Sequence, residues 1–147
     1  MLMKTTLRWQ EKMAFTGEAD GHRINLDAKA PFGAGSGMTP KELLPLAVSG
    51  CSGMDVAALM KKNKQPVESL EVEAEATMKE GSQPAVFSDL VLTFKLTGQI
   101  DKDKLLEAVR LSQTRFCGVS AMLSKSVPIH YRVILNAVEI GHGEASF

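Results

Sequence analysis

The sequence lacks the features typical of secreted and membrane proteins, which are many cysteines, a signal-peptide pattern or a long apolar run. Only two of its 147 residues are cysteine, whereas eight are methionine. The first residues, MLMKTTLRWQEKM, lack the apolar core of a signal peptide. No uninterrupted apolar run reaches the length of a membrane span. We therefore expect a cytoplasmic protein with no membrane partner, whose thiols are free or catalytic rather than structural disulfides.

The sequence also lacks an excess of charge and a metal-binding pattern. The formal net charge is +0, whereas a nucleic-acid or anionic-membrane surface needs a basic excess. We therefore expect no nucleic-acid partner. The three histidines, His22, His130 and His142, share no short spacing with either cysteine. This argues against a metal site and against a Cys–His hydrolase, and nothing in the sequence indicates a cofactor.

The stretch from Thr39 to Asn63 is predicted to be one long helix. Thr39 is a good N-cap, Pro40 suits the first helical position, and Glu42 stands at the third position. Together these residues form a capping box, in which two side chains satisfy free backbone N–H groups. Pro66 prevents the helix from continuing.

The middle of this helix is apolar nearly all round. Its only charge is Asp55, which we interpret as an exposed or hydrogen-bonded carboxylate. A helix of this kind is buried on more than one side, and a second copy of the chain would cover what one sheet cannot. The small residues from Ser49 to Gly53 indicate either a close helix crossing or a crossing that also exposes a thiol. One apolar stripe consists of Leu43, Ala47, Gly50, Met54 and Ala58.

Runs of alternating apolar and polar residues predict strands on both sides of the helix. Strands and helices are segregated along the chain, which favours a single α+β domain over residues 1–147 with mainly antiparallel sheet. Asp20-Gly21 is a strong two-residue hairpin signal. The glycine-rich segment Ala28 to Met38 is predicted to be a loop, which either lines a pocket or only connects the preceding strand to the long helix. The expected strands are Thr5–Trp9, Met13–Glu18, His22–Leu26, Val67–Lys79, Phe87–Thr97 and Pro128–Val138.

Two more helices are expected between the last two strands. A one-sided apolar stripe predicts a helix from Lys102 to Arg115, and a short helix follows a break close to Cys117. The tail from Gly141 to Phe147 is expected to be loose unless it docks on a partner.

The two cysteines differ in their expected environments. Cys117 at a helix N-terminus would have a lowered pKa, and Arg115 could add to this effect. Cys51 lies mid-helix, so its thiolate would need an outside partner, such as Arg23 or a residue of a second chain. These residues alone leave open whether the cysteines are structural or form a redox pair.

The surroundings of the two cysteines resemble those of the OsmC/Ohr family of thiol-dependent hydroperoxide reductases. The resemblance rests on TP-x-E-L leading into Cys51 within AVSGCSGMDV. It also rests on Cys117-Gly-Val-Ser with Met122 and Leu123 following. It implies an OsmC-like fold, in which antiparallel sheets wrap around central helices in an intertwined homodimer with active sites at the subunit interface.

The resemblance also implies a chemistry for both thiols. The residue corresponding to Cys51 attacks an organic hydroperoxide and becomes a sulfenic acid. The residue corresponding to Cys117 resolves it as a disulfide, which an external thiol reduces. The expected function is therefore thiol-dependent hydroperoxide reduction in oxidative-stress defence, without a cofactor.

The chain departs from the family at residues that activate the reactive thiol. The family places an Arg and a Glu there, but Lys41 stands at the Glu position. Glu42 comes one residue later, which rotates it by about 100° on a helix. Arg23 lies in the general region of the family Arg, so Arg23, Glu42 and Arg115 are the candidate thiolate-stabilising residues. Because of these departures the chain resembles a divergent branch of the family, and two alternatives to hydroperoxide reduction stay open. One is a non-catalytic stress or ligand-binding dimer, and the other is a thiol enzyme acting on another electrophile.

Overall fold

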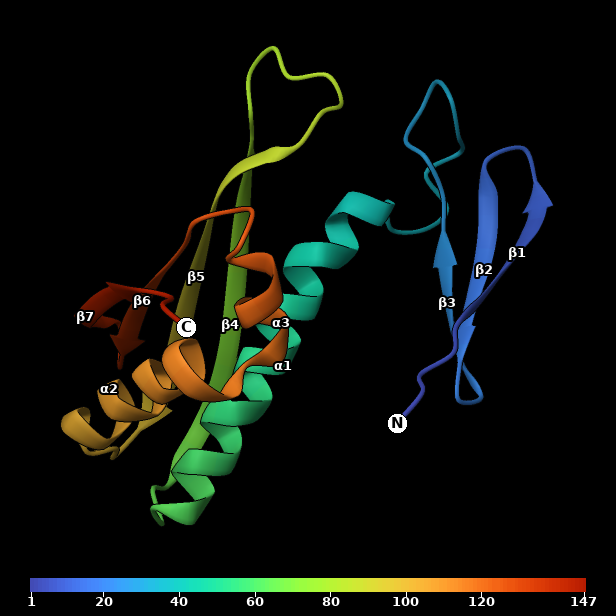
Figure 1. Cartoon of the computed structure of the whole chain (residues 1–147). Helices are drawn as coiled ribbons and strands as arrows, with labels where there is room; N and C mark the ends of the chain where they lie inside the picture. Colours follow the sequence, from blue (N-terminus) through green and yellow to red (C-terminus); the bar gives the residue numbers. More distant parts are fainter. The chain divides into compact units, whose positions relative to one another are not determined.

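A computed structural model describes residues 1–147, and the chain separates into two compact units, Met1–Leu44 and Pro45–Phe147 (Figure 1). Each unit is described by itself below. The two sheets and the helices confirm the predicted α+β class. The single domain over residues 1–147 stays a prediction.

The first unit contains a three-stranded antiparallel sheet in the order β1-β2-β3. The Asp20-Gly21 hairpin is confirmed, because Ala19 pairs with His22 around it. The φ angles of Asp20 and Gly21 are 48° and 78°, and two positive values are what a type I′ turn needs. The strands are β1 Thr6–Glu11, β2 Ala14–Ala19 and β3 His22–Leu26.

The glycine-rich loop after β3 is organised around the buried carboxylate of Asp27. Its Oδ2 atom accepts hydrogen bonds from the Ser36 hydroxyl at 2.7 Å and from the Ser36 backbone N–H at 3.0 Å. The backbone N–H groups of Ala28 and Ala34 donate to the same side chain. These donors hold the pKa of Asp27 below its usual value, with the Ser36 hydroxyl as the largest cause.

The second unit contains a four-stranded sheet in the order β4-β5-β6-β7. The β4–β5 and β6–β7 pairs are antiparallel, as the sequence predicts for most of the sheet. The β5–β6 pair is parallel, because the chain crosses over through three helical segments between these strands. The strands are β4 Val67–Met78, β5 Phe87–Gly98, β6 Ile129–Leu135 and β7 Val138–Glu144.

The secondary structure predicted for the C-terminal residues is wrong in one respect. The expected strand Pro128–Val138 is shorter, and most of the tail expected to be loose forms β7. Asn136 and Ala137 have φ angles of 49° and 66°, so they reverse the chain in a two-residue turn. The sequence hides this turn, because Ala137 stands where a glycine would have signalled it.

Helices cover one face of the four-stranded sheet (Figure 1). Helix α1, Pro40–Lys62, buries Val48, Val56 and Met60 in this core. The alternating side chains of β5 face the same core, whereas acidic side chains of β4 on the opposite face are exposed and pair with Lys95. The buried apolar side chains of β5 are Leu90, Leu92, Phe94 and Leu96.

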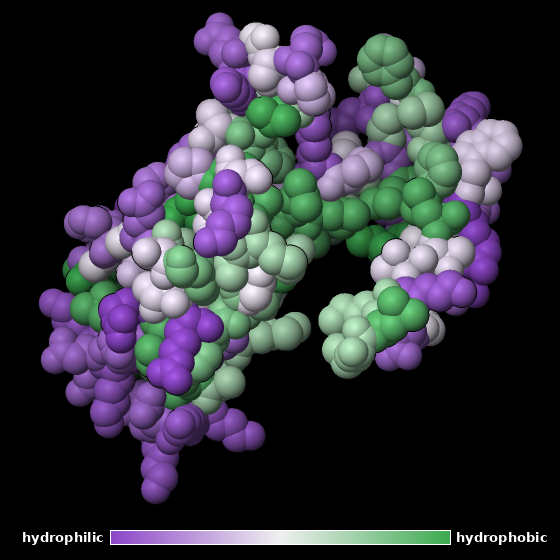
Figure 2. All heavy atoms as spheres, in the orientation of Figure 1, coloured by the Kyte–Doolittle hydropathy of each residue, from purple (hydrophilic) through white to green (hydrophobic).

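Helix α1 begins as the sequence predicts. Thr39 and Glu42 form the capping box, with the Thr39 backbone N–H donating to Glu42 at 3.1 Å and the Glu42 N–H donating to the Thr39 hydroxyl at 3.3 Å. In the single chain α1 is buried on one side only, and burial of its other side by a second copy of the chain stays a prediction. Met54 is 75% exposed, and Leu46 is 48% exposed. Green apolar side chains line the N-terminal turns of α1 in Figure 2.

By length and composition alone, α1 is also the one helix apolar enough to cross a membrane. Asp55 interrupts the apolar run of this helix, so the expectation of no uninterrupted apolar run of membrane-spanning length is not contradicted. One face of α1 packs through buried side chains on the sheet, as the core helix of a folded unit does.

The predicted helix Lys102–Arg115 changes geometry before its end. Helix α2, Lys102–Leu111, is capped by Asp101, which accepts from the Lys104 N–H at 3.0 Å. A single π-helical turn, η1, follows over Ser112–Phe116, and the short helix α3 covers Gly118–Leu123. Such turns inside helices are frequent at functional sites.

Candidate functional site

The two cysteines, far apart in the sequence, lie side by side in the second unit. Cys51 is half-buried on α1, and Cys117 is fully buried at the N-cap of α3. Both thiols are free. Their sulfur atoms and a carboxylate oxygen of Asp55 all lie within 4.8 Å of one another. The predicted position of Cys117 at the start of a short helix is confirmed.

Each sulfur faces hydrogen-bond donors. The Ser120 N–H lies 3.3 Å from Cys117 Sγ, and the Ser52 hydroxyl donates to the same sulfur at 3.4 Å. The backbone N–H of Val119 donates to Cys51. Donors of this kind favour a negatively charged sulfur.

A chain of hydrogen bonds runs from Asp55 to Cys117 through buried polar side chains. The Ser112 hydroxyl donates to Asp55 Oδ2 at 2.9 Å. Gln113 Nε2 donates to Ser112 at 3.2 Å and to the Ser52 hydroxyl at 2.7 Å, and Ser52 donates to Cys117. The turn η1 supplies both Ser112 and Gln113, so it joins the two helices that carry the thiols.

Sequence reasoning missed this network. In the sequence, Ser52 belongs to the run of small residues from Ser49 to Gly53, and Ser112 lies within the predicted helix Lys102–Arg115. The available signal was a polar residue at a position where the periodicity predicts burial. Such a residue needs a partner, because an unpaired buried polar group is costly.

Burial changes the pKa values of two groups in the site, Cys51 and Asp55. It raises the pKa of the Cys51 thiol, nearby Cys117 and Asp55 raise it further, and the Val119 N–H acts in the opposite direction. Burial also raises the pKa of Asp55, which the bond from Ser112 partly offsets. The second unit by itself therefore favours a protonated Cys51, and a nearby positive charge would be needed to ionise it.

The other predicted site residues have contacts of their own. Arg23 Nε donates to Glu18 at 3.3 Å on the first sheet, and Glu42 is engaged in the α1 cap and lies 4.0 Å from Lys29. Arg115 lies in the η1 turn, and its guanidinium carbon is 5.6 Å from the centre of the Phe116 ring. A thiolate-stabilising role for Arg23, Glu42 or Arg115 stays a prediction.

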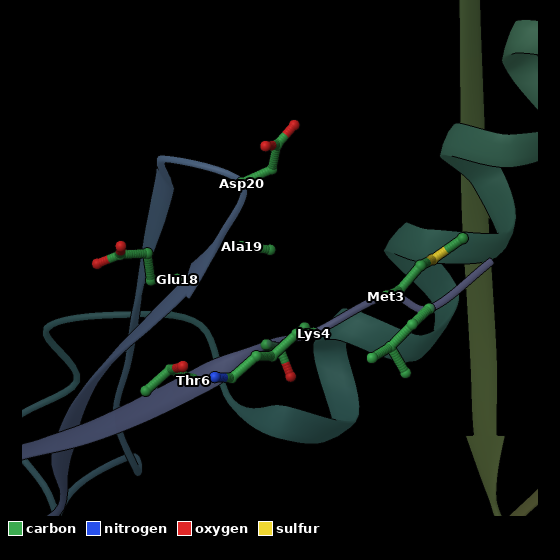
Figure 3. Close-up of a pocket in the computed structure, with 8 residues that line it drawn as sticks. Met3, Lys4, Thr6, Glu18, Ala19 and Asp20 are labelled. Atoms are coloured by element: carbon green, nitrogen blue, oxygen red, sulfur yellow. The ribbon is translucent and has the colours of Figure 1, made fainter.

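Two of the surface hollows in the first unit adjoin the N-terminal segment and the glycine-rich loop. One, of about 700 Å³, lies between the N-terminal segment and the β2–β3 turn, and Figure 3 shows Met3, Lys4, Glu18 and Asp20 around it. The other, of about 650 Å³, has a mainly apolar lining that includes Phe32 of the loop. The glycine-rich loop thus does line a pocket, but neither hollow holds a thiol.

Comparison with known proteins agrees with this arrangement. A family profile described as OsmC-like protein matches residues 33–132. Protein YhfA of Escherichia coli K12 is 36% identical over 129 residues, covering 86% of this chain and 93% of that protein.

Solved structures show the same fold. An OsmC like protein from Mycoplasma pneumoniae has a TM-score of 0.79 at 16% identity, covering 92% of this chain and 97% of that one. The organic hydroperoxide resistance protein OhrB of Bacillus subtilis has a TM-score of 0.65 at 20% identity, covering 92% and 98%. With the family match over more than half of its length, this chain belongs to the OsmC-like protein family, the OsmC/Ohr group.

Proposed function

We propose that the protein reduces organic hydroperoxides through Cys51 and Cys117, with an external thiol as reductant. The proximity of the two sulfur atoms carries this proposal, because a sulfenic acid on one could be resolved by the other after a small movement. Cys51 is the half-buried member, so it is the thiol that a small substrate can reach. Structural relatives named for organic hydroperoxide resistance support the choice of substrate.

The steps balance without a cofactor. The Cys51 thiolate attacks the peroxide, a sulfur–oxygen bond forms, and the oxygen–oxygen bond breaks to release an alcohol that takes up one proton. Cys117 then attacks the sulfenic acid, a disulfide forms, and water leaves. Two equivalents of external thiol restore the dithiol and become a disulfide themselves.

The raised pKa of Cys51 means that activation needs a positive charge. The resemblance to the family names an Arg for this task, and Arg23 stays our candidate. Lys41 at the family Glu position marks the chain as a divergent branch, and we expect its turnover to differ from that of other members.

We further propose a cytoplasmic homodimer. The stripe on α1 leaves Met54 exposed together with the small residues Ala47, Gly50 and Ala58, and Leu46 of the same helix is also exposed. A monomeric protein rarely exposes a contiguous apolar surface of this kind, and a second copy would bury it. The other partners proposed are small molecules: the hydroperoxide and the reducing thiol.

The test is intact mass and free-thiol count after reduced protein receives one equivalent of cumene hydroperoxide. We expect both thiols and two hydrogens to be lost, with no oxygen added. Cys117→Ser should gain one oxygen on Cys51 as a trapped sulfenic acid, whereas Cys51→Ser should not react. Turnover by Cys51→Ser would overturn the assignment of the nucleophile.

A second candidate is a ligand-binding dimer whose cysteines do not turn over peroxide. Lys41 at the family Glu position is the observation that favours it, since the expected activating carboxylate is missing there. Two thiols untouched by excess hydroperoxide, in a protein that dimerises normally, would support this candidate. If the thiols instead react with a different electrophile, the protein is a thiol enzyme of another class.

A further inference from the structure

We propose that the reduced protein binds a thiophilic divalent cation, of the Zn²⁺ class, through Cys51, Cys117 and Asp55. This adds a binding function to the proposed peroxide site. No sequence pattern predicts this site, because the three residues share no metal-binding spacing and no histidine takes part.

The geometry of the cluster suits a small tetrahedral ion. Its three potential ligand atoms lie within 4.8 Å of one another. Zinc binds thiolate sulfur at about 2.3 Å and carboxylate oxygen at about 2.0–2.2 Å, so ligand atoms around one ion lie roughly 3.5–4 Å apart. Asp55 follows Cys51 by one helical turn on α1, so both point from the same face toward Cys117. Small side-chain rotations would therefore close the site.

The surrounding hydrogen bonds orient the ligands as metal sites require. Ser112 donates to Asp55 Oδ2 at 2.9 Å, which leaves the other carboxylate oxygen free to bind an ion. Cys117 is fixed by donors from Ser120 and from the buried Ser52. Cys51 is only half-buried, so a water molecule or a small ligand could complete a fourth position.

The charges of the cluster also favour a cation. Two thiolate sulfurs and a carboxylate oxygen at this separation repel one another, and a divalent cation bound between them offsets this repulsion. Within Pro45–Phe147, the salt bridges of lysine and arginine involve other acidic residues and not Asp55. A divalent ion would supply the missing charge.

Binding is a ligand exchange without oxidation or reduction. The ion replaces the two thiol protons, which pass to the solvent, and forms bonds to both sulfurs and to one carboxylate oxygen. A Cys51–Cys117 disulfide has no thiolate to offer. Bound metal and disulfide are therefore mutually exclusive states of one site, and the metal would shield the thiols from peroxide.

The test is titration of reduced protein with Zn²⁺ in competition with a chromophoric chelator, and with Co²⁺ followed by its thiolate charge-transfer absorption. We expect one ion per chain. Cys51→Ser, Cys117→Ser and Asp55→Asn should each weaken Zn²⁺ binding by at least tenfold, and Ser112→Ala should weaken it by about 10–100-fold as loss of a supporting bond does. The matched control Asp89→Asn, at a half-buried carboxylate on β5, should bind as the wild type does.

Two results would overturn the site: no stoichiometric binding by the reduced wild type, or wild-type affinity in both Asp55→Asn and Cys117→Ser. Binding that persists in the disulfide form would overturn it as well. Because this inference rests on the proposed peroxide site, disulfide formation by metal-free protein is measured separately. A protein that forms the disulfide but does not bind Zn²⁺ contradicts only the metal site, and the reverse result contradicts only the peroxidase.

Discussion

The side-chain amide of Gln113 donates a hydrogen bond of 2.7 Å to the hydroxyl of Ser52, although the two residues are 61 positions apart. Both side chains are completely buried, and Ser52 in turn donates to Cys117. The bond therefore fixes the η1 turn against α1 where the two thiols meet. The wider i to i+5 spacing of η1, with the Cys117 N–H bonded to the Ser112 carbonyl, brings Ser112 and Gln113 to α1 and Cys117 to the next helix.

Ser52→Ala should disturb both stability and the thiol chemistry. It leaves the buried Gln113 amide without its shortest partner, which should lower the free energy of unfolding by about 1–3 kcal/mol. It also removes a donor to Cys117, so disulfide formation after peroxide addition should slow. Urea denaturation and rapid-quench thiol trapping measure the two effects. The exposed Ser126→Ala should change stability by no more than about 0.5 kcal/mol, and equal effects of the two variants would contradict the role of Ser52.

Phe94 is the largest fully buried side chain of the second unit. It lies on β5 between β4 and β6, opposite Val72 and Val133. Phe94→Ala should lower the free energy of unfolding by about 3–5 kcal/mol, because it removes apolar contacts and leaves a cavity. Phe116→Ala is the control, since Phe116 is 47% exposed. Chemical denaturation measures the free energy of unfolding of both variants. An equal decrease in both would mean that Phe94 does not lie at the centre of the hydrophobic core.

Asp27 should make stability depend on pH in the acid range. Its folded pKa is lowered, so its contribution is fully present above the unfolded value of about 3.9 and is lost as pH falls through the folded pKa. Asp27→Asn should therefore be less stable than the wild type at neutral pH, and this difference should shrink below about pH 4. Thermal melts across this range measure the difference.

Asp20→Asn, at an exposed carboxylate in the β2–β3 turn, provides the control for this titration. This variant removes a carboxylate that accepts none of the hydrogen bonds of the glycine-rich loop. A difference between Asp27→Asn and the wild type that stays constant with pH would mean that the Asp27 carboxylate does not hold the loop.

Much of the fold could be predicted because its signals are local. The Thr39–Glu42 cap, the Asp20-Gly21 turn and the alternation of β4 and β5 each lie within a few residues. The missed β7 shows the limit of this approach. Its turn depends on two residues, Asn136 and Ala137, in positive-φ conformations, and sequence propensity gives little reason to expect alanine there.

Ala137→Gly should therefore stabilise the protein by up to about 1 kcal/mol, because it relieves a left-handed conformation at φ 66° that is unfavourable for a residue with a Cβ atom. Ala85→Gly, at an exposed loop position without positive φ, should instead be neutral or destabilise by about 0.4–1 kcal/mol through added freedom of the unfolded chain. Denaturation midpoints compare the variants. Destabilisation by both would show that the turn is not strained at Ala137.

The candidate site could be predicted only in part. Cys51 and Cys117 stood out as the only cysteines, and the start of α3 was readable near Cys117. The partners Ser52, Ser112 and Gln113 could not be assigned, because packing and not local spacing brings them together. The same holds for Asp55, whose nearness to both sulfurs follows from the crossing of α1 with α3.

The exposed stripe of α1 leads to the last prediction, on assembly. Met54 is 75% exposed on the helix that carries Cys51, so a dimer that buries α1 would bury Met54 with it. Met54→Glu should raise the dimer dissociation constant by at least tenfold, since it places a charge in an apolar interface. Light scattering over a range of concentrations measures this change, with Val86→Glu in an exposed loop as the control. If Met54→Glu leaves the dimer dissociation constant unchanged, the dimer uses another surface, and a second copy of the chain does not cover the stripe.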